Sequence, residues 1–199
     1  SILSMGSCFA DAFGRQMERL GMHVSINPFG ITFDAFSIER QLSYFSGESL
    51  PKDVFQHLEL WRHFDCHGSL SHPDRSAFEE TLDHQLTVGR QAFSNARMLI
   101  LTFGTSFFFQ KDQREVANCH KLPAQNFNRK LAEPKELYER ISQRVLGFIE
   151  QDEDREVLLS VSPIRHIRDG LAENNRSKAR LIELSHSLCE VHERIRYFP

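Results

Sequence analysis

Apolar runs alternate along this chain with longer stretches in which apolar residues recur every three or four positions. The runs predict four short strands, at residues 2–5, 23–26, 98–103 and 156–161. The periodic stretches predict five helices, at residues 11–20, 37–47, 76–93, 134–151 and 177–195. Strands that alternate with helices in this way predict an α/β fold, a three-layer αβα doubly wound parallel sheet.

The run at 98–103 is the strongest of these strands, because it is continuously apolar, as in strands buried on both faces of a parallel sheet. Two short runs at 107–110 and 115–117 then predict a hairpin. Residues 48–75 show no regular pattern and combine aromatic with polar side chains, so we expect either a functional loop or a surface excursion. No element is predicted after residue 195.

The composition is that of one globular α/β domain over residues 1–199, with 40% apolar and 26% charged residues and a formal net charge of -3. Because the basic residues are spread out among acids, we expect no nucleic-acid partner. No apolar run is long enough for a membrane span and no leader is visible, so a cytoplasmic protein is favoured. The four cysteines lack metal-ligand spacing, so we expect no metal, no other cofactor and no disulfide scaffold.

Polar clusters that contain glycine or proline follow each predicted strand. They are Gly6-Ser7, residues 27–30, residues 104–106 and residues 162–166. In an open parallel sheet, ligands bind outside the carboxyl ends of the strands. The sequence therefore predicts a small-molecule site at this edge.

Ser7 is the candidate nucleophile of that site. Gly6 lets the backbone turn sharply, so the serine hydroxyl can sit at the mouth of the following helix, where free N–H groups favour developing negative charge. The N–H groups of Ser7 and Gly30, with a side chain from residues 104–106, are candidate donors to an oxyanion. Two alternatives stay open: Ser7 only caps the helix, or Cys8 is the nucleophile.

A base for this serine is harder to find. No Asp-x-x-His occurs, and Glu183-x-x-His186 lies inside the last predicted helix, where capping and surface exposure explain it better. His120 and His166 lie near the predicted edge and are the candidates within the chain. Histidines in such loops also bond to the backbone or contact the substrate.

Several motifs together resemble the GSCFA family. The first, Gly6-Ser7-Cys8-Phe9-Ala10, is the pentapeptide that names the family. The further matching stretches are residues 27–30, 101–106, 116–121 and 162–166, then Asp169-Gly170, Asn174 and Ser177-Lys178. The family is similar to the SGNH/GDSL hydrolases, which are serine esterases and lipases on a flavodoxin-like sheet, and the resemblance implies that fold and chemistry for nearly the whole chain.

The resemblance also implies roles for particular residues. Ser7 resembles the nucleophile and, through its N–H, one oxyanion donor, while Gly30 and Gly104 match the glycines of the second and third motifs. Ser106 stands where the superfamily usually has asparagine. A hydroxyl is shorter than an amide and donates only one hydrogen bond, so the third donor is in question.

Thr105, Asn118, His120, Arg165 and His166 lie in the matching stretches and are candidate substrate-binding residues. Arg165 and His166 suit an anionic or polyhydroxyl substrate. The catalytic aspartate and histidine of the superfamily have no match here, and the resemblance implies that they follow residue 199 in a segment like Asp-x-x-His-Pro. We therefore expect the domain to be incomplete at one or both ends.

Two functions fit these observations. The first is a serine esterase that cleaves small acyl or carbohydrate O-acyl esters through an acyl-enzyme on Ser7, with that ester as its small-molecule partner. The second is a non-catalytic carbohydrate-binding or interaction module on the same fold, favoured by the departure at Ser106 and by the missing Asp-x-x-His.

Overall fold

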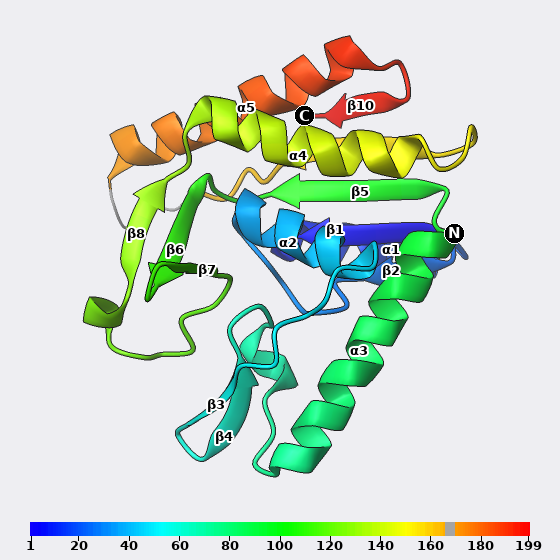
Figure 1. The fold of residues 1–199 in the computed structure, drawn as a ribbon. Helices are drawn as coiled ribbons and strands as arrows, with labels where there is room; N and C mark the ends of the chain where they lie inside the picture. Colours follow the sequence, from blue (N-terminus) through cyan, green and yellow to red (C-terminus); the bar gives the residue numbers. More distant parts are fainter. Residues whose placement is uncertain (166–169) are drawn as a thin grey trace.

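The computed structural model describes residues 1–165 and 170–199. A parallel sheet forms its centre (Figure 1). The strands of this sheet are β1 (Ile2–Gly6), β2 (Val24–Ile26), β5 (Met98–Phe103), β9 (Glu156–Val161) and β10 (Ile195–Phe198). Their order across the sheet is β10-β9-β5-β1-β2. The chain therefore adds β2 on one side of β1 and then adds β5, β9 and β10 on the other side, so the direction in which strands are added reverses at β1. This reversal is the strand order of flavodoxin-like sheets.

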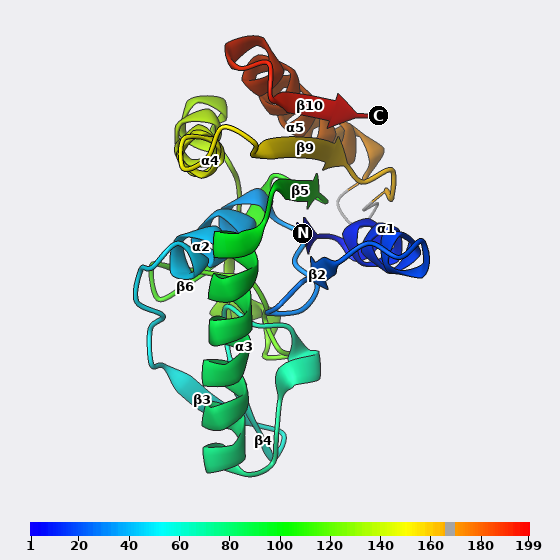
Figure 2. The same ribbon diagram turned by 90° about the vertical axis from the view of Figure 1, so that its right-hand side faces the viewer.

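Helices cover both faces of the sheet. They are α1 (Cys8–Arg19), α2 (Ala35–Phe45), α3 (Arg75–Asn95), α4 (Pro134–Ile149) and α5 (Leu171–Val191). Figure 2 shows α1 on one face and α2, α3 and α4 on the other. Right-handed crossovers require this, because the step from β1 to β2 runs one way across the sheet and the later steps run the other way. The predicted three-layer αβα doubly wound fold is confirmed.

Two small antiparallel sheets lie outside the parallel one. The first is the hairpin of β3 (Val54–His57) and β4 (Leu60–His63), and the second contains β7 (Arg114–Val116), β6 (Phe107–Lys111) and β8 (Asn128–Leu131). Short 3-10 helices occupy Gly68–Leu70 and Ala124–Asn126. The hairpin predicted at 107–117 is confirmed as β6 and β7, whereas β3, β4 and β8 lie where the pattern indicated no strand.

The last residues differ from the prediction. The final helix ends at Val191, and residues 195–198 form β10 beside β9. Val191 is 52% exposed and Ile195 only 3%. The apolar stripe of the helix therefore stops at Leu188, and Ile195 is buried because it belongs to a strand. The helix also begins earlier than predicted, directly after Gly170, which has a φ of 87°.

The core lies between the sheet and α2, α3, α4 and α5. Alternate residues of the central strands enter it, because successive side chains of a strand face opposite sides. They include Leu3 and Met5 of β1, Leu99, Leu101 and Phe103 of β5, and Val157 and Leu159 of β9. Phe36, Phe78 and Phe148 reach them from the helices and are fully buried. Burial of each such side chain contributes roughly 1.5–3 kcal/mol to the free energy of unfolding. Packing in this core therefore holds the strands, and with them their carboxyl ends, in position.

Candidate functional site

The structure brings four of the predicted polar clusters to one edge of the sheet. Gly6 ends β1 and Ser7 follows it, Gly30 follows β2, Gly104 follows β5 and Ser162 follows β9. These strands are parallel neighbours, so their carboxyl ends meet at the same edge. We call this group of strand ends the carboxyl edge.

The turn from β1 into α1 requires glycine at position 6. Gly6 has a φ of 131°, and a Cβ there would lie 2.1 Å from the carbonyl oxygen of Thr102. The Gly6 N–H donates to Asn27 Oδ1 at 2.8 Å, and its carbonyl accepts from the Thr32 N–H at 3.0 Å. Neighbouring segments therefore hold the turn that presents Ser7.

Ser7 is the N-cap of α1 and is 1% exposed. Its Oγ accepts a long hydrogen bond of 3.3 Å from the Phe9 N–H. No residue in the described part of the chain accepts the proton of this hydroxyl. The positive end of the helix dipole lies beside the oxygen. This arrangement makes a helix cap, and it also leaves the hydroxyl proton available to a base.

The backbone donors expected around Ser7 are already used inside the protein. The N–H groups of Ser7, Gly30 and Gly104 donate, in that order, to the carbonyls of Thr102, Asn27 and Phe33, at 3.1, 2.7 and 2.8 Å. An N–H that donates to a carbonyl reaches an oxyanion only if that bond opens. The donor set implied by the resemblance is therefore not free in this structure.

The hydroxyl residues after β5 face α5. Ser177 Oγ accepts from the Ser106 N–H at 2.8 Å and lies 3.0 Å from Thr105 Oγ1. Ser106 Oγ donates to the Ser177 carbonyl at 3.1 Å, and the residue Ser106 is 2% exposed. The serine that stands in place of asparagine thus ties the start of β6 to α5. Its hydroxyl is thus engaged with α5, and the third oxyanion donor, which the sequence left in question, stays a prediction.

Lys178 places a positive charge between the ends of β5 and β9. Its Nζ donates to the Gly104 carbonyl and to the Ser162 carbonyl, both at 2.6 Å. No carboxylate within residues 1–165 and 170–199 pairs with it, and burial lowers the pKa of Lys178 from 10.5 to about 8. Arg165 is exposed at the same edge. His166 lies outside the described residues.

Asn118 and His120 belong to a turn beside the β3–β4 hairpin. Asn118 Oδ1 accepts from the His120 N–H at 2.8 Å, and His120 has a φ of 50°. His120 Nε2 donates to the His63 carbonyl at 2.8 Å, while Nδ1 faces Arg62 Nη1 at 3.4 Å. Burial lowers the pKa of His120 to about 4. The ring is neutral at pH 7 with both nitrogens engaged, and among the described residues its contacts are with the β3–β4 hairpin and Phe64 and not with Ser7.

His67 lies at the carboxyl edge, although the sequence did not single it out as a site residue. A Cβ on Gly30 would lie 2.4 Å from His67 Cβ, and the His67 N–H donates to the Phe29 carbonyl at 2.8 Å. Its Nδ1 accepts from the Ser69 N–H at 3.2 Å, so the neutral ring carries its proton on Nε2. Nδ1 is therefore engaged within its own turn by Ser69.

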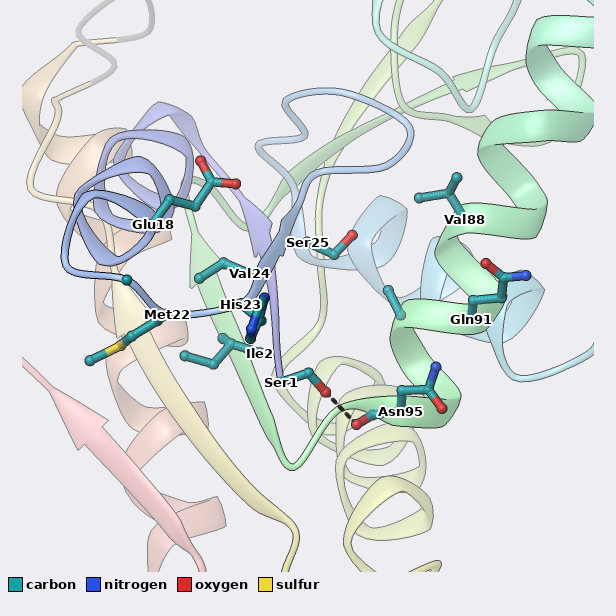
Figure 3. Close-up of a pocket in the computed structure, with 12 residues that line it drawn as sticks. Ser1, Ile2, Glu18, Met22, His23, Val24, Ser25, Val88, Gln91 and Asn95 are labelled. Atoms are coloured by element: carbon teal, nitrogen blue, oxygen red, sulfur yellow. Dashed lines mark hydrogen bonds between the residues drawn. The ribbon is translucent and has the colours of Figure 1, made fainter.

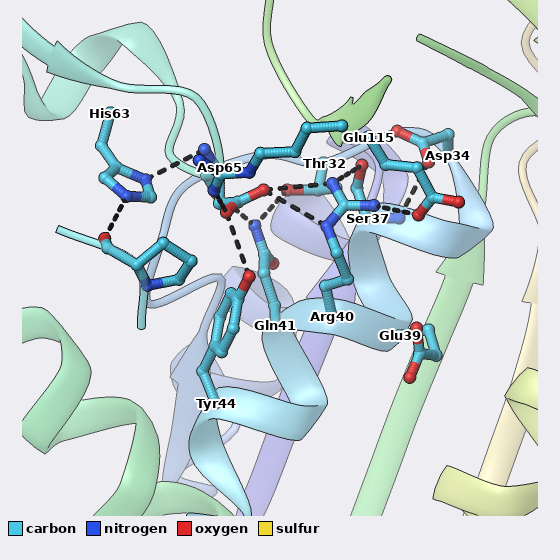
Figure 4. A network of polar contacts seen from close by, with 12 residues as sticks. Thr32, Asp34, Ser37, Glu39, Arg40, Gln41, Tyr44, His63, Asp65 and Glu115 are labelled. Carbon is cyan, nitrogen blue, oxygen red and sulfur yellow. Dashed lines mark hydrogen bonds and ion pairs between the residues drawn. The ribbon is translucent and has the colours of Figure 1, made fainter. Parts of the chain in front are cut away.

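A buried polar network joins α2 to the segment after β4 (Figure 4). Asp65 is fully buried and accepts from Arg40 Nη2 at 3.1 Å, Tyr44 Oη at 3.1 Å and Arg114 Nη2 at 2.8 Å. Asp34 caps α2 through a backbone N–H of the first turn, and burial raises the pKa of Asp34 to about 6. These carboxylates have protein partners, so the network holds residues 48–75 in place beside the carboxyl edge.

A cavity of about 620 Å³ lies at the other end of the sheet. The start of β1, β2 and the ends of α1 and α3 form its walls (Figure 3). Glu18 and His23 line it together with mostly apolar or small side chains. Ligands of open parallel sheets bind at the carboxyl ends, so we assign no function to this cavity. Within the described ranges, no three His, Cys, Asp or Glu side chains are grouped as metal ligands.

The model of the GSCFA family matches residues 1–199. The chain belongs to the GSCFA family. The pentapeptide of that name, Gly6-Ser7-Cys8-Phe9-Ala10, forms the turn from β1 into α1. No curated protein and no solved structure matches this GSCFA chain. Of the helices that the structure describes, none is long and apolar enough to cross a bilayer.

Proposed function

We propose that this GSCFA protein is a serine hydrolase that cleaves small acyl or carbohydrate O-acyl esters through an acyl-enzyme on Ser7. The position of Ser7 carries the proposal. Ser7 caps α1 at the carboxyl end of β1, after a glycine whose place no side chain could take without a clash. The helix dipole favours negative charge there, and the similarity of the family to SGNH/GDSL hydrolases supports the same chemistry.

In the first step, Ser7 Oγ attacks the ester carbonyl carbon and the carbonyl oxygen becomes an oxyanion. The hydroxyl proton passes to a base and then to the oxygen of the leaving alcohol as the C–O bond breaks. A water molecule next attacks the acyl-enzyme, which releases the carboxylic acid and returns a proton to Ser7. A histidine is the expected base, and His166 stays a prediction from the sequence.

Positive charge at the carboxyl edge supports a substrate that carries an anionic or polyhydroxyl group beside the ester. Lys178 lies between two strand ends without a carboxylate partner in the described part of the chain, and Arg165 is exposed in the segment that follows β9. Both side chains are donors only, so they suit phosphate, carboxylate or hydroxyl oxygens.

A carbohydrate-binding or interaction module is the second candidate, and the bonding of Ser7 favours it. The Ser7 hydroxyl already caps α1. The N–H groups expected to stabilise an oxyanion are engaged, and Ser106 faces α5. On this hypothesis the edge binds a carbohydrate without cleaving it.

Replacement of Ser7 by alanine in the full native chain tests the esterase. Loss of the nucleophile should lower hydrolysis of an aryl acetate by at least ~10³-fold, the scale of nucleophile knockouts. A fluorophosphonate probe should label the wild type at Ser7, located by mass spectrometry, and should not label Ser7→Ala.

Two variants serve as controls for this test. Ser142→Ala removes a hydroxyl from the surface of α4 and should leave hydrolysis and labelling unchanged. Cys8→Ala should keep both, whereas loss of labelling in Cys8→Ala would assign the reaction to the thiol. A wild-type protein that neither hydrolyses the ester nor reacts with the probe, yet binds carbohydrate in calorimetry, would favour the binding module.

A further inference from the structure

Buried polar atoms without a hydrogen-bond partner are concentrated at one turn. Within residues 1–165 and 170–199 they are Asn27 Nδ2 and Thr102 Oγ1. Asn27 bonds through its other amide atom to the Gly6 N–H, and Thr102 is the register partner of Gly6 on β5. A buried donor left unpaired costs about 1–3 kcal/mol. Two such atoms on either side of the turn that presents Ser7 indicate a ligand group that pairs with them.

The amide of Asn27 is held in one orientation. Asn27 is 8% exposed and has a φ of 43°. Its N–H donates to the Ser4 carbonyl at 2.9 Å, and its carbonyl accepts from the Gly30 N–H at 2.7 Å. The Gly6 N–H needs an acceptor, so Oδ1 faces Gly6 and Nδ2 is the atom left over. The donor is therefore in place before a substrate arrives.

We propose that Asn27 Nδ2 donates a hydrogen bond to the oxyanion that forms when Ser7 attacks an ester. This inference rests on the proposed function and specifies its donor. The N–H groups of Ser7, Gly30 and Gly104 already donate to carbonyls, and Ser106 bonds to α5. An asparagine amide that would come from the loop after β5 is supplied here from the loop after β2. Preorganised donors of this kind are most effective in a site that excludes water, and Ser7 is 1% exposed.

Asn27→Asp in the full native chain tests the donor. A carboxylate keeps an acceptor for the Gly6 N–H and removes the N–H₂ group. At neutral pH we expect kcat to fall by about 10²–10³-fold, the usual loss for one oxyanion donor, with KM close to the wild-type value. Acidification protonates the carboxyl of the variant and restores a donor, so its kcat relative to wild type should recover as the pH falls. Protonation also removes a buried charge, so urea unfolding at each pH must show that the variant stays folded; recovery of kcat at a constant folded fraction is the result that a purely structural role would not give.

A second variant keeps the test decisive if Asn27→Asp does not fold. Asn27→Gly retains the positive φ and the backbone bonds of this position, and it removes the Oδ1 acceptor of the Gly6 N–H together with the Nδ2 donor, so Ser7 labelling by the fluorophosphonate probe must first show that the turn is intact. Its affinity for an aryl boronic acid, which forms a tetrahedral adduct on a serine, should fall by about the same factor as kcat. Asn128→Asp makes the same chemical change on exposed β8 and should leave both quantities unchanged.

The outcomes separate this inference from the proposed function. Wild-type kcat and boronate affinity in folded Asn27 variants would overturn the role of Asn27 while Ser7→Ala still abolished hydrolysis. A wild-type protein that is inactive and unlabelled at Ser7 would overturn both. Loss of kcat in Asn27→Asp with recovery at low pH would support both.

Discussion

At the level of single residues, Asp34 shows how a useful hydrogen bond and an unfavourable charge can lie in one side chain. Its carboxylate accepts from the Ser37 N–H at 2.8 Å and so caps α2. Arg40 attracts the charge, yet burial has the larger effect and raises the pKa of Asp34 from 3.8 to about 6. The cap needs an acceptor and does not need the negative charge.

Asp34→Asn should therefore remove the charge and keep the cap. The native carboxyl holds its proton up to about pH 6 and the unfolded one only to about pH 4, so this group lowers the wild-type free energy of unfolding as the pH rises between them. Relative to Asp34→Asn, the wild type should lose on the order of 2–3 kcal/mol across this window.

Urea unfolding at pH 4 and at pH 7 measures that difference. Asp34→Ala serves as the control, because it loses the cap and should cost about 1 kcal/mol at the pH where the wild-type carboxyl is neutral. A wild type that gains stability relative to Asp34→Asn on going to pH 7 would contradict the assignment of burial as the larger effect.

The candidate site could be predicted residue by residue only where the chemistry is local. Gly6-Ser7 predicts a sharp turn into a helix because both residues act on their own backbone, and the structure has this turn. The role of Ser106 could not be predicted, because its partner Ser177 lies 71 positions away. The unpaired amide of Asn27 likewise depends on Gly6, which is adjacent only in the folded sheet.

At the level of elements, two helical glycines have opposite surroundings. Gly89 in α3 lies against Phe45 of α2, and a Cβ on Gly89 would lie 2.2 Å from the ring of Phe45. Phe45 is only 3% exposed. Gly147 in α4 has no atom within 4 Å of its would-be Cβ. The close contact of α2 with α3 therefore depends on Gly89, whereas Gly147 only weakens its helix.

The same substitution should change stability in opposite directions at these positions. Gly89→Ala should lower the free energy of unfolding by roughly 1–3 kcal/mol, because the ring of Phe45 must move within a packed core. Gly147→Ala should raise it by roughly 0.5–1 kcal/mol through helix propensity alone. Denaturant unfolding of both variants gives the comparison, and a stabilising Gly89→Ala would show that α2 and α3 pack less closely than described.

Periodicity predicted the elements with long buried faces and missed the short ones. The β3–β4 turn places Leu58 and Glu59 at φ of 50° and 59°, a conformation for which sequences usually supply asparagine or glycine. The amino-acid sequence of that turn therefore did not indicate a hairpin. Strand β10 was missed because its buried Ile195 continues the apolar spacing of α5, and only pairing with β9 separates the two.

At the level of the whole molecule, residues 48–75 form an excursion that returns to the carboxyl edge. The His67 N–H bonds to Phe29, beside Gly30, and the buried Asp65 receives hydrogen bonds from α2 and from β7. Charges in this excursion differ in burial, since the side chain of Asp65 is 1% exposed and that of Asp53 is 46% exposed. Asp53 also pairs with Arg114. The two carboxylates thus allow a matched comparison.

Asp65→Asn should loosen the excursion and leave the parallel sheet folded. The variant leaves Arg40 and Arg114 facing an amide that cannot balance their charge, and breaking such a buried pair costs about 3–5 kcal/mol. Local opening is the cheapest response, so hydrogen exchange should quicken in β3 and β4 while amides of β1 and β5 keep their protection. Asp53→Asn should change exchange little, because exposed ion pairs contribute about 0–1 kcal/mol. Equal acceleration in β5 would contradict this expectation, because it would mean that the excursion and the sheet unfold as one unit.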